Sequence, residues 1–156
     1  MRKDEFVMRG KTPSNEYEIL NFSGFKPGYA YKLIEFQLYP STSIGSQTHE
    51  LSATITAAKL TGSPPASPAD PSNPDFSQEG LIGTAVNVRD DGQRSVYVDS
   101  VINDTFFITQ NLILAVIDSH AGTPMDVNWQ CKFKPVKMSG SEEAVANYRQ
   151  FMISDD

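Results

Sequence analysis

The sequence contains a single cysteine, Cys131, and only two histidines. A lone cysteine cannot form an internal disulfide, so disulfide-stabilised scaffolds are excluded and a reducing compartment is indicated. A structural zinc site needs four Cys or His ligands, more than the chain contains. Cations are also in the minority, because 13 Lys and Arg stand against 19 Asp and Glu and give a net charge of −6. Since a surface of that sign repels phosphate backbones, we do not expect the domain as a whole to bind nucleic acid.

Long apolar runs are missing as well. The longest, Leu112–Ile117, is about a third of the length that a helix needs to cross a bilayer. Four charged residues follow Met1, and no apolar signal-peptide core comes after them. We therefore expect no membrane span and no signal peptide, in a chain that is made and kept soluble in a reducing cytoplasm, or released from it by lysis rather than by secretion.

The middle of the chain shows the alternation of apolar and polar residues that is typical of half-buried strands. Strands are expected at 17–23, 33–39, 50–59, 80–89, 96–98, 105–118 and 125–133. The segment 105–118 is apolar on both faces and should break or bulge near 109–111, while Ser52, Thr54 and Thr56 should face solvent. About eight strands without intervening helices predict an all-β fold, an antiparallel β-sandwich of the jelly-roll type.

A chain of 156 residues has room for one domain. We expect the sandwich at residues 15–138, after an N-terminal arm at 1–14. A capping-box pattern begins at Ser139, and apolar residues then recur at helical spacing, so a short C-terminal helix or tail is expected at 139–156.

The segment 61–80 holds five of the ten prolines and cannot pair as a strand. It is expected to be an exposed loop that touches a neighbour or a receptor, with Phe76 as its anchor. The alternative is a tolerated insertion, because a longer loop costs little extra entropy.

No arrangement of residues predicts catalysis. Asp118, Ser119 and His120 supply the letters of a hydrolase triad, but contiguous residues cannot form the relay, so Asp118 or Ser119 should bond the local backbone. His49 is expected to be solvated or bonded locally. Nucleophile-elbow, phosphate-loop and zinc-protease motifs are missing from the sequence. The prediction is a non-enzymatic protein without catalytic residues, metal site or cofactor.

Two sets of residues are candidates for binding. Tyr29, Tyr31 and Tyr39 share a parity opposite to the apolar set of their strand and predict an aromatic platform for an interface or a ligand. A strand covered on both faces is the alternative. Cations occur near the N-terminus and on the last strand, where they predict a weak nucleic-acid or assembly contact, or simply a soluble surface: Arg2, Lys3, Arg9, Lys11, Lys132 and Lys134.

Three segments, Tyr31–Tyr39, 105–112 and 127–133, give the region 15–138 a general character that resembles single jelly-roll capsid or capsid-associated proteins of bacteriophages. The resemblance implies a virion structural protein, either a capsid subunit or a decorating subunit, that assembles in the host cytoplasm. It also implies self-association as a trimer or lattice and contact with other capsid proteins. The alternative is a carbohydrate- or receptor-binding sandwich, such as a spike or lectin-like module.

Overall fold

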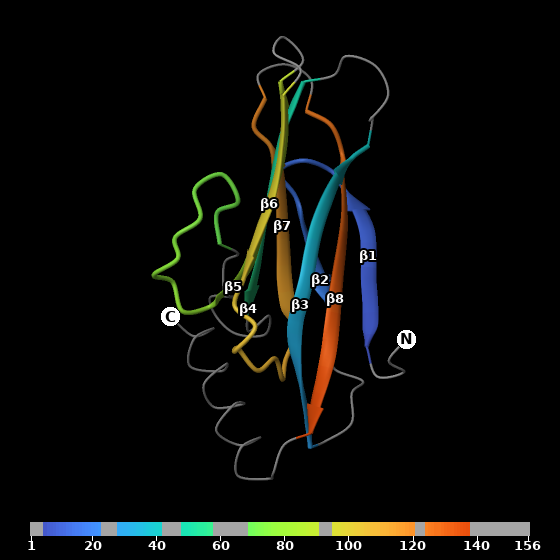
Figure 1. The fold of residues 1–156 in the computed structure, drawn as a ribbon, viewed down its shortest axis with the longest axis vertical. Coiled ribbons are helices and arrows are strands. Elements are labelled where there is room, and N and C mark those ends of the chain that lie inside the picture. Colours follow the sequence, from blue (N-terminus) through green and yellow to red (C-terminus); the bar gives the residue numbers. More distant parts are fainter. Residues whose placement is uncertain are drawn as a thin grey trace.

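The computed structural model describes residues 5–22, 28–41, 48–57, 69–90, 95–120 and 124–137. In this part the chain is all-β, and its two antiparallel sheets form a sandwich, as the alternation predicts (Figure 1). The first sheet has the strand order β1-β8-β3 and the second β2-β7-β4-β5-β6. The strands are β1 (Phe6–Thr12), β2 (Tyr17–Leu20), β3 (Tyr29–Pro40), β4 (His49–Ala57), β5 (Leu81–Asp90), β6 (Ser95–Ile102), β7 (Leu112–Asp118) and β8 (Val127–Lys137).

The core lies between the two sheets and is built by alternate residues of each strand. On β8, Val127, Trp129, Cys131 and Phe133 are buried, while the residues between them are part-exposed. Each large apolar side chain buried in this way contributes about 1.5–3 kcal/mol. Aromatic rings close one end of the core, where Phe133 stacks on Phe6 at a centroid distance of 5.5 Å.

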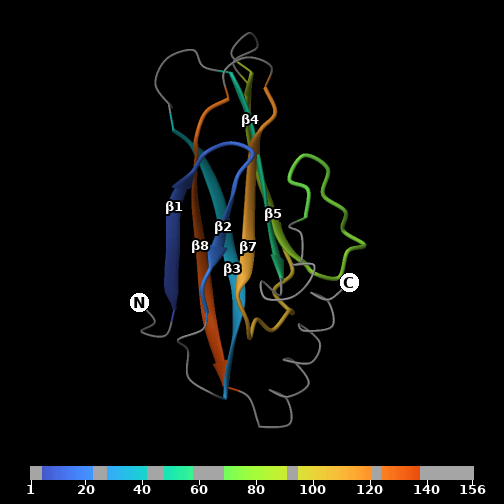
Figure 2. The same ribbon diagram turned by 180° about the vertical axis from the view of Figure 1, so that it is seen from behind.

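Residues 6–12 are a strand of the sandwich rather than part of an arm. β1 pairs with β8 along its whole length and forms one edge of the first sheet (Figure 2). Gly10 lies opposite Trp129, and a Cβ there would come within 2.8 Å of the indole ring, so only glycine fits without displacing the ring. The indole N–H donates to the hydroxyl of Thr12 at 2.9 Å, which fixes the far end of the strand.

A β-bulge in β3 changes which residues of that strand face the core. The register with β8 shifts between Leu33 and Glu35, so Ile34 is the extra residue. Tyr31 and Leu33 before the bulge are therefore buried together with Phe36 and Leu38 after it. The expectation that Tyr31 lies on an exposed face is wrong, because it assumed one unbroken alternation.

The structure also settles the predicted break in the long apolar segment. β7 begins only at Leu112, and Ile108 instead forms an isolated bridge with Tyr31, with hydrogen bonds of 2.7 and 2.9 Å. The break near 109–111 is confirmed. The expected C-terminal helix at 139–156 and the first part of the proline-rich loop, 61–68, lie outside the described residues.

The described part of the loop, 69–80, covers the outer side of β4. Thr54 donates its hydroxyl to the carbonyl of Ala69 at 2.7 Å, and the hydroxyl of Thr56 accepts from the Ala69 N–H at 2.9 Å. Ser52 donates to the carbonyl of Pro71 at 2.6 Å. The expectation that this hydroxyl row faces solvent is wrong for Thr54 and Thr56, which are buried because the loop uses them as hydrogen-bond partners.

Candidate functional site: an open strand edge and a basic sheet face

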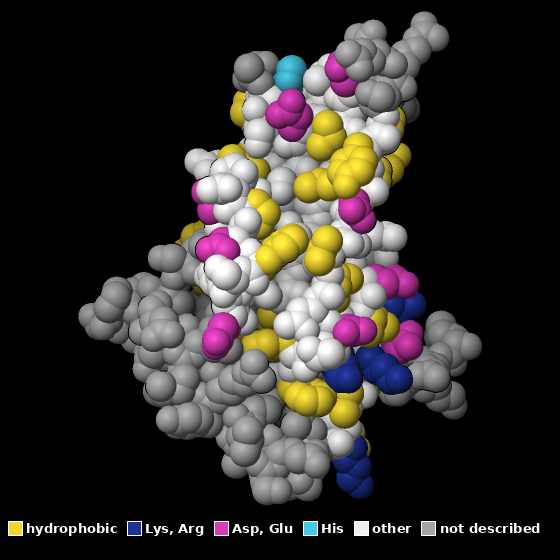
Figure 3. All heavy atoms as spheres, turned by 60° about the vertical axis from the view of Figure 1, so that its left-hand side comes forward, with side chains coloured by type: hydrophobic (Ala, Val, Ile, Leu, Met, Phe, Trp, Pro, Cys, Tyr) yellow, Lys and Arg dark blue, Asp and Glu magenta, His cyan; other side chains and the backbone are white. Residues whose placement is uncertain are grey.

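The second sheet is wider than the first, and no other strand in the described residues pairs with the outer edge of its last strand, β6. Four large apolar side chains of β6 are between 51% and 63% exposed: Val96, Tyr97, Val98 and Val101. They belong to both faces of the strand, since Val96 and Val98 have the opposite parity to Tyr97 and Val101. Figure 3 shows apolar side chains at the surface on the side of the molecule that carries β6. We call residues 96–101 the open edge.

The backbone of the open edge also lacks a strand partner in the described part of the chain. Asn103 donates its N–H to the carbonyl of Ile82 at 2.8 Å, and this bond sets the phase of the β5–β6 ladder. In an antiparallel pair the bonding residues alternate, so Tyr97, Asp99 and Val101 bond to β5. The even-numbered residues 96, 98 and 100 point their N–H and C=O groups outward, which is the arrangement that recruits a further strand.

Polar groups at the middle of the open edge are bonded within the strand. The Tyr97 hydroxyl donates to Asp99 Oδ2 at 3.1 Å, and this bond together with the nearby carboxylate charge raises the pKa of Tyr97. The backbone N–H of Ser100 donates to Asp99 Oδ1 at 2.8 Å. Asp99 therefore satisfies one of the outward donors, while the apolar side chains around it remain exposed.

The outer face of the first sheet gathers the cations that the sequence places in separate segments. Val7, Arg9 and Lys11 alternate with the core residues of β1, so both cations point outward, as Lys132 and Lys134 do on β8. Lys32 of β3 lies directly opposite Lys134 of β8 and belongs to the same group of outward cations. This basic face consists of Arg9, Lys11, Lys32, Lys132 and Lys134. Arg2 and Lys3 lie outside the described residues.

Charge is divided between the two sheets. The strands of the first sheet carry six cations, the five of the basic face and Lys137, against the single carboxylate of Glu35, a net charge of +5. The strands of the second carry one cation, Arg89, against five carboxylates, a net charge of −4: Glu18, Glu50, Asp90, Asp99 and Asp118. Lys132 is paired with Glu5 at 3.5 Å. In Figure 3 the Lys and Arg side chains lie together at the lower right and bottom.

The predicted tyrosine platform is divided by the bulge. Tyr31 is buried, Tyr29 is 38% exposed before the bulge, and Tyr39 is 59% exposed on the outer face after it. Tyr39 borders a hollow of about 580 Å³ on the three strands of the first sheet, lined also by the amides of Gln37, Asn128 and Gln130. The guanidinium of Arg9 donates to the side-chain carbonyl of Gln130 in the same hollow.

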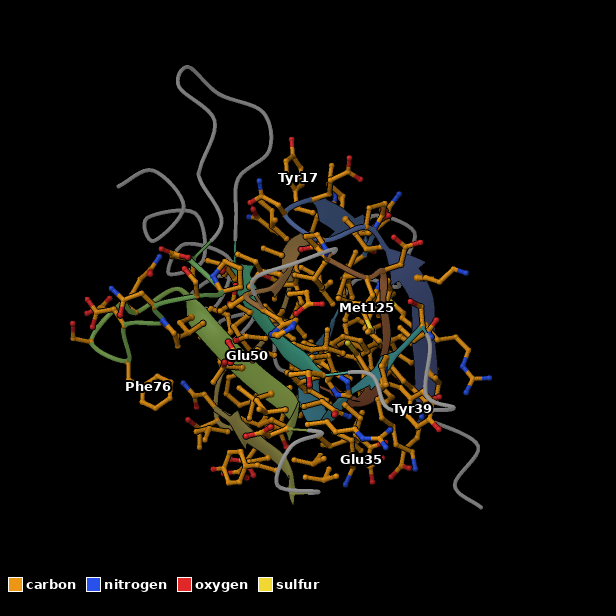
Figure 4. All side chains as sticks on the ribbon, turned by 90° about the horizontal axis from the view of Figure 1, so that it is seen from above. Tyr17, Glu35, Tyr39, Glu50, Phe76 and Met125 are labelled. Atoms are coloured by element: carbon orange, nitrogen blue, oxygen red, sulfur yellow. The ribbon has the colours of Figure 1, made fainter. Side chains whose placement is uncertain are left out.

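Phe76 is separate from these tyrosines. It is exposed on the loop, and Figure 4 shows it on the side of the molecule opposite Tyr39. Asp75 beside it accepts hydrogen bonds from the N–H and hydroxyl of Ser77 at 2.9 and 2.6 Å, which lower the pKa of Asp75. A hollow of about 400 Å³ separates residues 76–79 from β5 and β6. Phe76 is thus held by a defined turn at the side of the second sheet.

Asp118 organises a loop instead of a triad. Its carboxylate is buried and accepts from the backbone N–H groups of Glu50, His120 and Met125 at 3.0–3.1 Å. The expectation that Asp118 bonds local backbone is confirmed. His49, expected to be solvated or bonded locally, is buried and shares a 2.8 Å hydrogen bond between its Nε2 and Asn87 Oδ1 on the neighbouring strand.

The described residues contain no group of three or more His, Cys, Asp or Glu side chains that could hold a metal ion. The same residues contain no helix long and apolar enough to cross a membrane.

Sequence reasoning missed the open edge, although a signal was present. Residues 96–102 are apolar at both parities, Val96 and Val98 on one and Tyr97 and Val101 on the other. A strand that is apolar at both parities is usually covered on both faces, so the surplus of apolar residues would have been assigned to the core. In the described part of the chain the opposing sheet has fewer strands, and this difference in width, which accompanies the exposure of β6, is not a local property.

The chain matches no known protein-family model and no curated protein sequence.

Proposed function

We propose that the protein is a non-enzymatic structural subunit that associates with copies of itself, as a capsid or capsid-decorating protein of a bacteriophage does. The observation that carries the proposal is the open edge of β6, where four large apolar side chains and a row of outward backbone groups are exposed together. A monomeric protein normally protects such an edge, because it pairs with other strands. The virion setting rests on the resemblance of residues 15–138 to phage coat proteins.

The strand order supports the finer assignment to a jelly roll. A jelly roll is a long hairpin wrapped into a sandwich, so that strand 1 pairs with 8, 2 with 7, 3 with 6 and 4 with 5. The pairs β1–β8, β2–β7 and β4–β5 are present, while β6 is bonded to β5 instead of β3. The proposed fold is a jelly roll with one displaced strand, followed by a helix at 139–156.

Light scattering on a concentration series, followed by electron microscopy of the largest species, tests the proposal. Oligomers or particles should form and grow with concentration. A monodisperse monomer at every concentration and salt level would refute self-association. The basic face, with Arg2 and Lys3, is proposed to contact acidic neighbours or, weakly, nucleic acid, and these contacts should weaken as salt rises.

A carbohydrate- or receptor-binding module is the second candidate, and the hollow beside Tyr39 favours it. An exposed aromatic ring next to the amides of Gln37, Asn128 and Gln130 offers stacking and hydrogen bonding to a sugar. A glycan array should then give signals that disappear with Tyr39→Ala and persist with Tyr17→Ala, an equally exposed tyrosine on β2. Signals that both variants retain would exclude this hollow.

A further inference from the structure

We propose that two chains pair through their open edges, so that β6 of one chain runs antiparallel to β6 of the other with Val98 facing Val98 of the second copy. The inference rests on the self-association proposed above and specifies its surface and register. A two-fold interface uses the same patch on both subunits, so one strand must supply both halves of every contact.

The backbone limits the registers that are available. Val96, Val98 and Ser100 point their N–H and C=O groups outward, whereas the residues between them are bonded to β5. A two-fold axis that passes between two residues would set a bonding residue against a non-bonding one. The axis must therefore lie between one residue and the same residue of the second copy, so that this residue faces itself. Near the centre of the strand the self-facing residue can be 97, 98, 99 or 100.

The side chains then select one of these four positions. An axis beside Asp99 would set two carboxylates against each other, and like charges in that position destabilise a sheet. An axis beside Ser100 would set Asp99 against the apolar Val101. An axis beside Tyr97 would set Ser100 against residue 94, beyond the end of β6, so that only four backbone hydrogen bonds form within the strand. With the axis beside Val98, valine faces valine and each Asp99 faces a Tyr97 hydroxyl of the other copy.

The same register replaces every hydrogen bond that it breaks. Within one chain Asp99 accepts from Tyr97 and from the Ser100 N–H. In the pair, the Ser100 N–H donates to the Val96 carbonyl of the second copy and Asp99 accepts from the facing Tyr97. The pairs 96–100, 98–98 and 100–96 contribute two backbone bonds each, six in total. Val98 faces Val98, while Val96 and Val101 face serines and lie diagonally beside Val98 and Tyr97 of the second copy.

A cysteine scan of the open edge reads the register directly. Facing residues of a bonded antiparallel pair have Cα atoms about 5.5 Å apart, within the range that a disulfide spans. Val98→Cys should therefore give a covalent dimer under mild oxidation, with at least tenfold more product than Tyr97→Cys, Asp99→Cys or Ser100→Cys. The wild-type chain is the control, because its one cysteine, Cys131, is buried and burial raises the pKa of its thiol.

A second pair of variants does not depend on oxidation. Val98→Lys places two ammonium groups opposite each other and should raise the dissociation constant roughly tenfold. Val7→Lys is the matched control, because Val7 is an exposed valine on the edge strand of the other sheet. The dissociation constant of the dimer should be unchanged in this variant. Circular dichroism should show that both variants are folded.

The outcomes separate this inference from the proposed function. Dominant cross-linking at 97, 99 or 100 would overturn the register. A lack of cross-linking at all four positions, or an unchanged affinity of Val98→Lys, in a chain that still assembles would overturn the β6 interface and leave self-association to another surface. A wild-type chain that is monomeric throughout would overturn both.

Discussion

Replacing Thr54 and Thr56 by valine tests how the loop is held on the second sheet. Valine keeps the shape of threonine and removes only the hydroxyl, so Ala69 loses the donor to its carbonyl and the acceptor of its N–H. Ala69 is 3% exposed, and a buried polar group left without a partner costs about 1–3 kcal/mol. Since two such groups are affected, the double variant should lose about 2–6 kcal/mol of unfolding free energy.

The matched control is Thr84→Val. Thr84 lies directly opposite Thr54 in the β4–β5 register, is also buried, and its hydroxyl has no hydrogen-bond partner among the described residues. Removing that hydroxyl should be neutral or slightly stabilising. Urea unfolding followed by the fluorescence of the single tryptophan, Trp129, measures both variants. Equal effects of the Thr54/Thr56 double variant and of Thr84→Val would refute the claim that loop hydrogen bonds, rather than general packing, hold residues 69–71.

Three further variants test other contacts. Asp118→Ala should cost at least 3 kcal/mol, because three backbone donors lose their acceptor, whereas the exposed Asp104→Ala should cost under about 0.5 kcal/mol in the same urea assay. Burial raises the pKa of the Cys131 thiol, which stays protonated in the fold, so this group should lower stability by about 1.4 kcal/mol per pH unit above pH 9.0, the ordinary thiol pKa, and Cys131→Ala should remove that contribution to the slope. Gly10→Val should displace the Trp129 ring and shift its emission, and an unchanged spectrum would contradict the close approach.

Most strands could be predicted because alternation is a local property. β8 buries every second residue from Val127 to Phe133, and that signal lies within a few positions of the sequence. β4, β5 and β7 also bury runs of consecutive residues, 53–57, 81–85 and 112–116, so their alternation in sequence shows them to be strands but not how fully they are covered. β1 was missed because its inward set contains Gly10 and Thr12, which carry no apolar signal. Their place in the core depends on Trp129, more than a hundred residues away.

The candidate site was less predictable, since it depends on which strands become neighbours. The two pairs of cations, Arg9 with Lys11 and Lys132 with Lys134, were visible in the sequence, but only the β1–β8 register places them on one face. The bulge at Ile34 likewise arises from pairing with β8 and reverses the predicted exposure of Tyr31. Exposure of β6 follows from the difference in width between the two sheets, which no single strand encodes.

The charge division and the open edge have a joint consequence for assembly. Residues that face each other across an antiparallel pair point to the same side of the sheet, so the two-fold axis of the proposed dimer is perpendicular to the joined sheet. Both basic faces then lie on one side of the dimer, and both acidic second sheets, with Asp70, Asp75 and Glu79 of the loop, lie on the other. The net charge of +5 on the strands of each first sheet is therefore doubled on one side instead of being cancelled. A layer built from such dimers would have a basic surface and an acidic surface, as a coat that distinguishes its contents from its exterior requires.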